Sequence, residues 1–447
     1  MEPFRLSAVE AARAIADGEI SSEDLVDSCL ARIAEIEDGI GAWVAIDPEH
    51  ALDQARAADE RRRLGRPTGP LNGVPVGVKD IFETAALATE YGSPLYAGHR
   101  PRADAAVVSL LRQAGAVVLG KTVTSEFAYV HPGKTRNPCD PRRTPGGSSS
   151  GSAAAVAAAM VPVAVGSQTN GSVIRPAAFC GVFGYKPTFG LISRRGMLQL
   201  ARSLDTVGVF ARSVEDLALV AEALMAFDPR DPAMEPRAVP PLVALARTAP
   251  PVPPRLAFVR TPMWERTDAL AREAFAELIA VLGDRVEEVD LSPELAAVYD
   301  RHRAVMEAEM ACALARDATR GAAAIGPALM RAVERGRSVT AVAYLEALGG
   351  METLVADLEA LRTAFDAILT PAAPGVAPEG LGSTGDPAFC TPWSYGGLPA
   401  LSLPLLTGDD GLPLGVQLIA PRNDDARLMR TAKWLVERVA AEGMAAA

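Results

Sequence analysis

Residues 144–160 read TPGGSSSGSAAAVAAAM, and a compact apolar run, VPVAV, follows at residues 161–165. The glycine and serine residues predict a loop, the alanine run predicts a helix, and the apolar run predicts a buried strand. A loop of this composition at the start of a helix presents backbone N–H groups and hydroxyls together. This stretch is typical of an α/β architecture, in which helices pack on a sheet.

Strands and helices continue to alternate on both sides of this stretch. The upstream sequence predicts two helices within 8–36, a strand in GVPVGVKD at 73–80, a helix at 104–115 and a strand at 116–121. The downstream sequence predicts helices at 267–283, through most of 300–365 and from 424, and strands at 182–185, 256–259, 286–291, 366–371, 399–406 and 415–420. Short apolar strands without polar alternation indicate a sheet that is covered on both faces. The predicted fold class is α/β, a single large domain with a mixed, largely parallel central sheet and helices on both faces.

The organisation along the chain is marked by one proline-rich segment. Nine prolines fall within residues 229–254, which predicts an extended, exposed connection. We therefore predict one domain over residues 1–447. Its parts are an N-terminal helical segment (1–66), a catalytic core (67–228), the proline-rich connection (229–254) and a C-terminal subregion (255–447).

Composition limits the possible classes of protein. The 447-residue chain is 49% hydrophobic and 22% charged, which excludes intrinsic disorder and allows a large core. Its net charge of −11 and the lack of a dense Lys/Arg run argue against nucleic acid as a direct partner. Five scattered cysteines without a C-x-x-C pair argue against a disulfide framework and a zinc cluster. The longest apolar stretch, 153–165, is too short to span a membrane and no signal peptide is evident, so the cytoplasm is the expected location.

The Gly-Ser loop has several competing interpretations. A phosphate-binding P-loop ends in Gly-Lys-Ser/Thr, whereas this loop ends in GSA at residues 151–153. A nucleophile elbow, G-x-S-x-G, matches residues 147–151 with Ser149 as nucleophile, but it needs a downstream histidine and only His302 follows. A flexible linker does not usually abut an apolar helix and strand. The fourth interpretation joins this loop to distant segments.

A second loop, GSQTNGS at residues 166–172, follows the strand at 161–165. Consecutive N–H groups in it are expected to form a concave nest for a developing oxyanion, those of Thr169, Asn170 and Gly171. Ser172 lies at the lip of this nest. None of the four histidines lies in a motif, but a buried, neutral lysine can serve as a base, and Lys79 ends an apolar strand.

With these segments the chain resembles the amidase signature family of Ser-Ser-Lys hydrolases. The resemblance extends over nearly the whole chain, and the spacings agree: 69 residues separate Lys79 from Ser148, and 24 separate Ser148 from Ser172. Further matching motifs are TSEFA at 124–128, RTPGGSSSGS at 143–152, GYKPTFG at 184–190, SLDTVG at 203–208, GLPALSLPL at 397–405 and GLPLGVQLIA at 411–420. In motif detail, NGSVIRPAAFCG at 170–181 and STGDP at 383–387 look most like malonamidase-type enzymes acting on small substrates.

The resemblance implies a role for each residue of the predicted site. Ser172 would be the acylated nucleophile, Ser148 would relay a proton, and Lys79 would be the base. Ser148 would be held by a cis peptide bond after Gly147, and Ser149 would be supporting. The family requires neither a metal nor a cofactor, and none is predicted here.

Two departures from the family pattern concern the nucleophile loop. The family commonly has Gly-Gly-Ser, whereas this chain has NGS at residues 170–172. Asn tolerates left-handed backbone angles better than most residues, so the nest is expected to survive. Many members carry an arginine two residues after the nucleophile, whereas Arg175 lies three after Ser172. This malonamidase-like placement implies that Arg175 meets a substrate carboxylate. The alternative is a structural arginine that caps nearby carbonyls, or pairs with an acid, and so holds the loop.

The main functional prediction is a metal-free amidase that cleaves a small linear carboxamide to a carboxylic acid and ammonia, with a substrate carboxylate left as an option. Its only predicted partner is the small-molecule amide, with no direct nucleic acid, no membrane and a homodimer left open. The alternative is the A-type subunit of a tRNA-dependent glutamyl/aspartyl amidotransferase, which releases ammonia from glutamine for a partner subunit. Both functions use the same catalytic residues, so the triad does not separate them.

Overall fold

A single sheet forms the centre of the molecule in the computed structural model, which describes residues 2–291, 293–408 and 411–443. Within these residues the sheet has eleven strands in the order β1-β3-β2-β4-β6-β5-β10-β11-β9-β7-β8. The strands are β1 (Trp43–Ile46), β2 (Pro75–Lys79), β3 (Val117–Thr122), β4 (Val163–Gln168), β5 (Phe183–Lys186), β6 (Thr206–Ala211), β7 (Leu256–Phe258), β8 (Val286–Glu288), β9 (Ala367–Pro371), β10 (Ala400–Thr407) and β11 (Pro413–Ile419).

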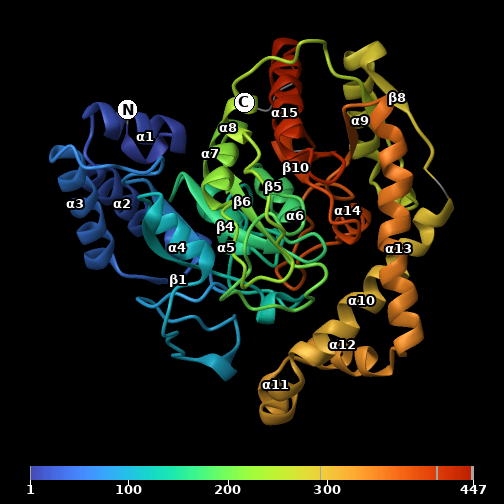
Figure 1. Cartoon of the computed structure of the whole chain (residues 1–447), viewed down its shortest axis with the longest axis horizontal. Helices are drawn as coiled ribbons and strands as arrows, with labels where there is room; N and C mark the ends of the chain where they lie inside the picture. The colour runs from blue at the N-terminus through green and yellow to red at the C-terminus, as the bar shows by residue number, and fades with distance from the viewer. Residues whose placement is uncertain (1, 292, 409–410, 444–447) are drawn as a thin grey trace.

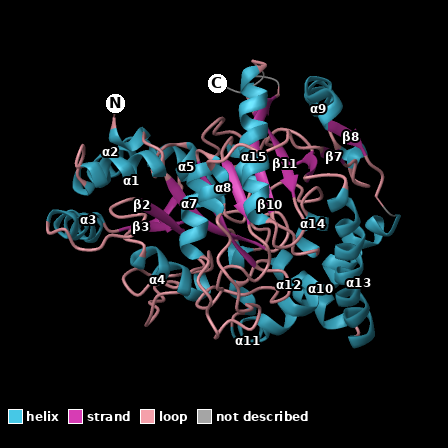
Figure 2. Cartoon of the chain, turned by 45° about the horizontal axis from the view of Figure 1, so that its top comes forward, coloured by secondary structure: helices cyan, strands magenta, loops and turns pink. Residues whose placement is uncertain are grey.

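Helices surround this sheet, as Figures 1 and 2 show. They are α1 (Ala8–Asp17), α2 (Ser22–Ile40), α3 (Pro48–Arg63), α4 (Ala106–Gln113), α5 (Ser150–Ala157), α6 (Ile174–Cys180), α7 (Val214–Leu224), α8 (Leu242–Ala246), α9 (Ala269–Leu282), α10 (Val298–Ala313), α11 (Ala315–Arg320), α12 (Pro327–Ser338), α13 (Ala341–Glu359), α14 (Thr391–Tyr395) and α15 (Asp425–Ala441). Strand β4 shows that both faces are covered, because Val163 and Val165 belong to one apolar cluster and Ala164 between them belongs to another. The predicted fold class, a mixed sheet between helices, is therefore confirmed.

The direction of the strands differs from the sequence prediction in one respect. Parallel pairing joins β2 to β3 and β4, and joins β7 to β8 and β9. The middle of the sheet is antiparallel, from β4 through β6, β5, β10 and β11 to β9. The sheet is mixed, but it is not largely parallel. Strands β5 and β6 follow each other along the chain through a long loop rather than a helix, and such a connection permits antiparallel pairing.

Both predicted N-terminal helices form, and α2 continues to Ile40, beyond the predicted end at residue 36. Ser7 and Ser21 each accept a hydrogen bond from the third residue of the following helix, and that residue's carboxylate bonds back to the serine N–H. Such reciprocal caps satisfy N–H groups that have no partner within the helix. Gly18 and Gly41 end the helices with positive φ values of 75° and 66°.

The sequence predicts that the proline-rich segment is extended and exposed. The structure differs, because part of the segment is helical and buried. Residues Leu242–Ala246 form the short helix α8, which packs against α7 and α15. Leu242 and Ala246 lie four residues apart on one face and are fully buried. Prolines before the helix do not prevent it, since the first N–H groups of a helix need no intrahelical acceptor.

Membrane spans need a long, apolar helix. None of the described helices alone combines the length and apolarity needed to cross a bilayer. Helix α12 and the segment Ala341–Thr363 are long and apolar enough only when they are taken together, and the chain bends by 99° between them.

Candidate active site

Lys79 is the last residue of β2 and is fully buried. Strand β2 lies between β3 and β4, so its end is enclosed by neighbouring strands. The Nζ atom of Lys79 lies 2.7 Å from Ser148 Oγ and 3.0 Å from Ser167 Oγ. The structure thus brings together Lys79 and Ser148, which are 69 residues apart in the sequence.

The surroundings of Lys79 favour its neutral form. Burial lowers the pKa of the Lys79 ammonium well below its usual value, and the negative charge of Asp205 opposes this effect in part. A neutral amine has a lone pair that accepts a proton, so Lys79 is able to act as a base toward the Ser148 hydroxyl.

Ser148 is buried and follows a cis peptide bond with Gly147, the geometry that the family resemblance implies. The carbonyl oxygen of Gly147 accepts a hydrogen bond of 2.6 Å from Nη2 of Arg175. A Cβ atom at Gly147 would lie 2.7 Å from Cγ2 of Thr384, so the approach of this segment leaves no room for a side chain.

Ser149 is fully buried, and its hydroxyl contacts the backbone of Ser167. Its hydroxyl donates to the carbonyl oxygen of Ser167 at 3.1 Å and lies 3.3 Å from the N–H of the same residue. A nucleophile needs access to its substrate, so this environment argues against the nucleophile-elbow interpretation of Ser149. The contact fastens the first loop to the end of β4, from which the second loop emerges.

Ser172 lies between β4 and α6 and is half-buried. Within the described part of the chain its hydroxyl has no hydrogen-bond partner, and neither do the N–H groups of residues 169–172. Arg175, one helical turn further on, bonds to Gly147, and this contact joins the loop of Ser172 to the segment of Ser148. The second loop therefore presents a free hydroxyl beside several free N–H groups.

Asp205 anchors the start of this loop from the residue before β6. Its Oδ1 accepts a hydrogen bond of 2.6 Å from the Thr169 hydroxyl. Its Oδ2 accepts from the N–H groups of Leu200 and Ala201, at 2.7 and 3.0 Å. Burial raises the pKa of the Asp205 carboxyl to about 6, against the effect of these hydrogen bonds. The negative charge of this carboxylate favours the protonated form of Lys79 and so raises the pKa of the lysine.

Arg175 is 4% exposed and lies in the first turn of α6. Its Nε donates to the carbonyl oxygen of Thr384 at 2.6 Å, and its Nη2 donates to Gly147 and to the Thr384 hydroxyl. Its Nη1 is buried and has no hydrogen-bond partner among the described residues. Burial lowers the pKa of this guanidinium from its usual value. Two of the three nitrogens thus hold loops together, and the third retains its hydrogen-bonding capacity.

Sequence reasoning missed several residues that support this site. Ser167 and Asp205 lie inside quoted motifs, but nothing in their spacing predicts a contact with Lys79 or Thr169. Thr384 lies in STGDP, a motif whose sequence alone indicates no contact with an arginine. No group of three or more His, Cys, Asp or Glu side chains in the described ranges is arranged to hold a metal ion.

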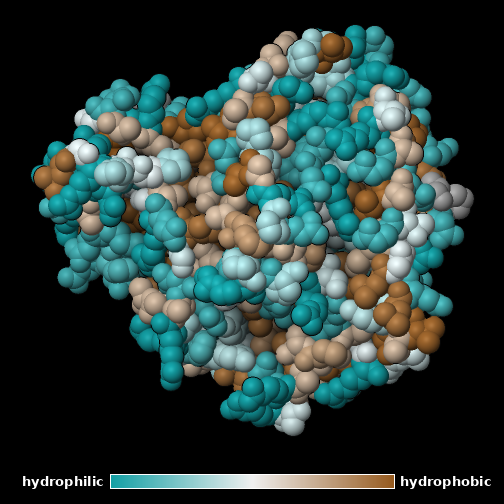
Figure 3. Space-filling model, viewed as in Figure 1, coloured by the Kyte–Doolittle hydropathy of each residue, from teal (hydrophilic) through white to brown (hydrophobic). Residues whose placement is uncertain are grey.

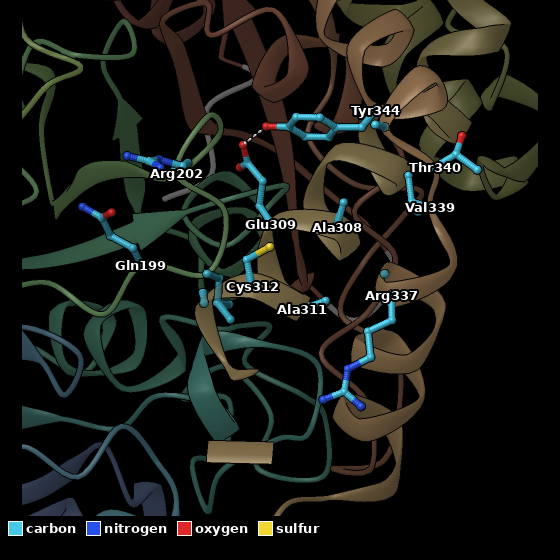
Figure 4. Close-up of a pocket in the computed structure, with 14 residues that line it drawn as sticks. Gln199, Arg202, Ala308, Glu309, Ala311, Cys312, Arg337, Val339, Thr340 and Tyr344 are labelled. Atoms are coloured by element: carbon cyan, nitrogen blue, oxygen red, sulfur yellow. Dashed lines mark hydrogen bonds between the residues drawn. The ribbon is translucent and has the colours of Figure 1, made fainter. Parts of the chain in front are cut away.

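A separate pocket of about 740 Å³ opens between the loop that contains Gln199 and Arg202 and the helices α10, α12 and α13 (Figure 4). Glu309 projects from α10 at this pocket and accepts hydrogen bonds from Ser203 and from the Tyr344 hydroxyl. None of the predicted catalytic residues lines it. In the view of Figure 1, the molecular surface alternates between polar and apolar areas (Figure 3).

Comparisons with known proteins extend these observations. A family model described as Amidase matches residues 24–429. The chain is 38% identical to the A-type subunit of the glutamyl-tRNA(Gln) amidotransferase from Salinispora arenicola, over 97% of each chain, and 37% identical to that from Thermobifida fusca, over 95% and 94%. The structure of the peptide amidase from Stenotrophomonas maltophilia is 31% identical, with a TM-score of 0.84 over 98% of this chain and 97% of the other. Another solved structure is 32% identical, with a TM-score of 0.91 over 98% of this chain and 99% of the other. It is described as a vestigial protein complex that reveals the evolutionary origins of an s-triazine catabolic enzyme.

These relatives correct two predictions made from the sequence. The main function, hydrolysis of a small linear carboxamide, is wrong, because relatives 35–38% identical over nearly their full length are named as A-type subunits of glutamyl-tRNA(Gln) amidotransferases. The predicted partners, a small molecule and at most a second copy, are wrong for the same reason, since these relatives are subunits of an assembly. Motif details such as those at residues 170–181 and 383–387 are too narrow a basis for choosing a substrate. The names of these relatives favour the alternative function, that of an amidotransferase A-type subunit.

Membership of the family does not depend on which of these two functions the chain has. The family model matches most of the chain, and the relatives and solved structures match almost all of it. The predicted resemblance is confirmed at the level of the family, and the malonamidase-type detail stays a prediction. The chain belongs to the amidase signature family and is an enzyme that hydrolyses amide C–N bonds.

Proposed function

We propose that this chain is the A-type subunit of a tRNA-dependent amidotransferase and releases ammonia from the side-chain amide of glutamine for a partner subunit. The observation that carries the proposal is the 35–38% identity to the A-type subunits of amidotransferases over nearly the full length of both proteins. The buried contact between Lys79 and Ser148 supports it, because a serine must be activated before it can attack an amide. Action in the cytoplasm is part of the proposal.

In the proposed first step, Ser172 Oγ attacks the amide carbon of glutamine. Its proton passes to Ser148 Oγ while the proton of Ser148 passes to the neutral Nζ of Lys79. The carbonyl π electrons move to oxygen, and the resulting oxyanion accepts hydrogen bonds from the N–H groups of Thr169, Asn170 and Gly171. Those N–H groups have no competing acceptor among the described residues.

In the second step, the tetrahedral intermediate collapses and the C–N bond breaks. The leaving nitrogen takes a proton from Ser148, which is reprotonated by the Lys79 ammonium, and leaves as ammonia. The glutamate side chain remains as an ester on Ser172. Water then attacks this ester with the same relay as base, glutamate leaves, and the hydroxyl of Ser172 is restored.

The remaining residues of the site support this relay. Ser149 holds the end of β4 through Ser167, and Gly147 gives Ser148 its position beside Lys79. We propose that Arg175 holds the Gly147 carbonyl through Nη2 and offers the free Nη1 to the carboxylate of glutamine.

Ammonia release from glutamine tests the function. The purified chain is assayed with glutamine and with simple carboxamides, alone and with the other amidotransferase subunits of the same organism. Glutamine hydrolysis that rises when the partners are added is the expected result. If the chain alone hydrolysed carboxamides rapidly and ignored glutamine with or without the partners, the proposal would be overturned.

A further inference from the structure

An oxyanion site built from backbone N–H groups depends on the orientation of each peptide unit. In a trans peptide the C=O of one residue and the N–H of the next point in opposite directions. A side chain that holds a carbonyl on one side of the loop therefore directs the following N–H to the other side. The loop after β4 has such a contact at Thr169 and another at Asn170.

His302 holds the first peptide unit. Its Nε2 lies 3.1 Å from the carbonyl oxygen of Thr169, and because a carbonyl only accepts, this nitrogen carries the proton. His302 projects from α10 and is 1% exposed, and its burial lowers the pKa of the imidazole to about 4. The ring is therefore neutral near pH 7 and acts as a fixed donor. The N–H of Asn170 is directed away from it.

Ser394 holds the second peptide unit, and the direction of its proton is determined by Gln168. The Oε1 atom of Gln168 accepts from the N–H groups of Val173 and Ile174 at 2.8 and 3.0 Å, so its amide nitrogen is the atom that meets Ser394 Oγ at 2.9 Å. The Ser394 hydroxyl accepts that bond and donates its own proton to the carbonyl oxygen of Asn170. The N–H of Gly171 then points away from Ser394.

We propose that His302 and Ser394, the latter oriented by Gln168, are positioning residues that direct the N–H groups of Asn170 and Gly171 into the oxyanion site. These side chains come from β4, α10 and α14, so three distant parts of the chain set the geometry of one loop. The inference rests on the proposed role of this loop. It does not depend on which amide is the substrate.

The test is the rate at which a fluorophosphonate probe labels Ser172 in the full-length protein, followed by mass spectrometry, together with kcat and KM for glutamine. The phosphonyl oxygen occupies the same site as the oxyanion, so labelling reports on the N–H groups directly. Loss of one oxyanion donor costs about 10²–10³ in kcat, and a donor that is present but misdirected should cost less. We expect Ser394→Ala to slow labelling and kcat roughly tenfold to hundredfold, with KM and the melting temperature nearly unchanged.

The matched control is Ser402→Ala, which removes a fully buried hydroxyl that has no described hydrogen-bond partner. It should label at the wild-type rate. If Ser394→Ala does not fold, His302→Leu and His302→Gln carry the test, because only glutamine supplies an N–H donor. The His302→Leu variant should be labelled more slowly than the wild-type protein, and the His302→Gln variant should keep most of the wild-type labelling rate.

Wild-type labelling rates in both Ser394→Ala and His302→Leu would overturn the inference, and so would losses confined to KM. Labelling needs neither glutamine nor a partner subunit. A wild-type protein that is labelled at Ser172 but does not hydrolyse glutamine would therefore refute the proposed function and leave this inference to be decided by the variants. A wild-type protein that is not labelled at Ser172 would refute both.

Discussion

At the scale of single residues, the enclosure of Lys79 is the feature on which the proposed chemistry depends. A lysine in water is protonated at neutral pH, since its pKa is about 10.4, and a protonated lysine is no base. Here the side chain is fully buried with two serine hydroxyls as hydrogen-bond partners, and burial lowers its pKa. The residue therefore gains basicity toward Ser148 at the pH of the cell.

The first prediction concerns removal of this base. Lys79→Ala should lower kcat for glutamine by about 10²–10⁴-fold, the usual cost of losing a general base. His302 is engaged with Thr169 and does not replace it. Steady-state kinetics with a circular dichroism control for folding measure the effect. A variant that kept more than a tenth of the wild-type kcat would rule out Lys79 as the base.

The second prediction concerns the pH dependence of kcat. The neutral form of Lys79 is the active one in the proposed mechanism, so the rate should rise with pH as the ammonium loses its proton. Because burial lowers the pKa of Lys79, the rise should be complete below the usual lysine pKa of about 10.4. The profile is measured at saturating glutamine under conditions in which chemistry limits the rate. A flat profile from about pH 5 to about pH 10 would contradict the assignment.

The third prediction concerns Arg175. Replacing it by alanine removes the free Nη1 as well as the contacts with Gly147 and Thr384. If Nη1 meets the substrate carboxylate, KM for glutamine should rise roughly 10- to 150-fold, the value of a charge-assisted hydrogen bond. An analogue with a blocked carboxylate serves as control and should show a smaller change. An equal loss for both substrates, with a lower melting temperature, would leave Arg175 only its structural role.

At the scale of secondary-structure elements, the sequence predicted most strands and helices but not their arrangement. Short apolar runs located β2, β3, β9, β10 and β11, and serine caps located α1 and α2. Strand β1 was missed because its four residues are only partly buried and lack a strong pattern. The strand order, the antiparallel centre and the buried helix α8 depend on contacts between distant segments, which composition does not encode.

The fourth prediction tests the packing of α8. Leu242 is fully buried against the core, so Leu242→Ala should lower the free energy of unfolding by about 2–5 kcal/mol. Val252, in the same proline-rich segment, is 69% exposed, and Val252→Ala should change it by no more than about 0.5 kcal/mol. Urea denaturation of both variants measures the difference. Equal, small effects would mean that the segment is loosely attached after all.

In the candidate site, too, the sequence predicted some residues, whereas the contacts between distant segments could not be predicted. Motif spacing predicted a site at Lys79, Ser148 and Ser172, and the structure places Lys79 Nζ 2.7 Å from Ser148 Oγ. The hydrogen bonds that Asp205, His302 and Ser394 make with Thr169 and Asn170 could not be predicted, since these partners lie 36 to 224 residues away in the sequence. Such contacts exist only once the chain has folded.

At the scale of the whole molecule, the function depends on more than the catalytic geometry. A buried lysine next to a serine suits a free-standing amidase as well as a glutamine-hydrolysing subunit, and sequence reasoning chose the former. The nearly full-length identity to the A-type subunits of amidotransferases favours the latter. The central claim is thus that ammonia made at Ser172 is used by a partner.

Transfer of isotope from glutamine tests that claim most directly. Glutamine labelled with ¹⁵N in its side-chain amide is incubated with this chain, the other amidotransferase subunits of its organism, ATP and glutamyl-tRNA(Gln). We predict that ¹⁵N appears in the amide of the tRNA-bound glutamine and that Ser172→Ala abolishes this transfer, while free ammonia restores amide formation by the variant. If the wild-type chain transferred no ¹⁵N although the complete mixture used free ammonia, the account would be contradicted.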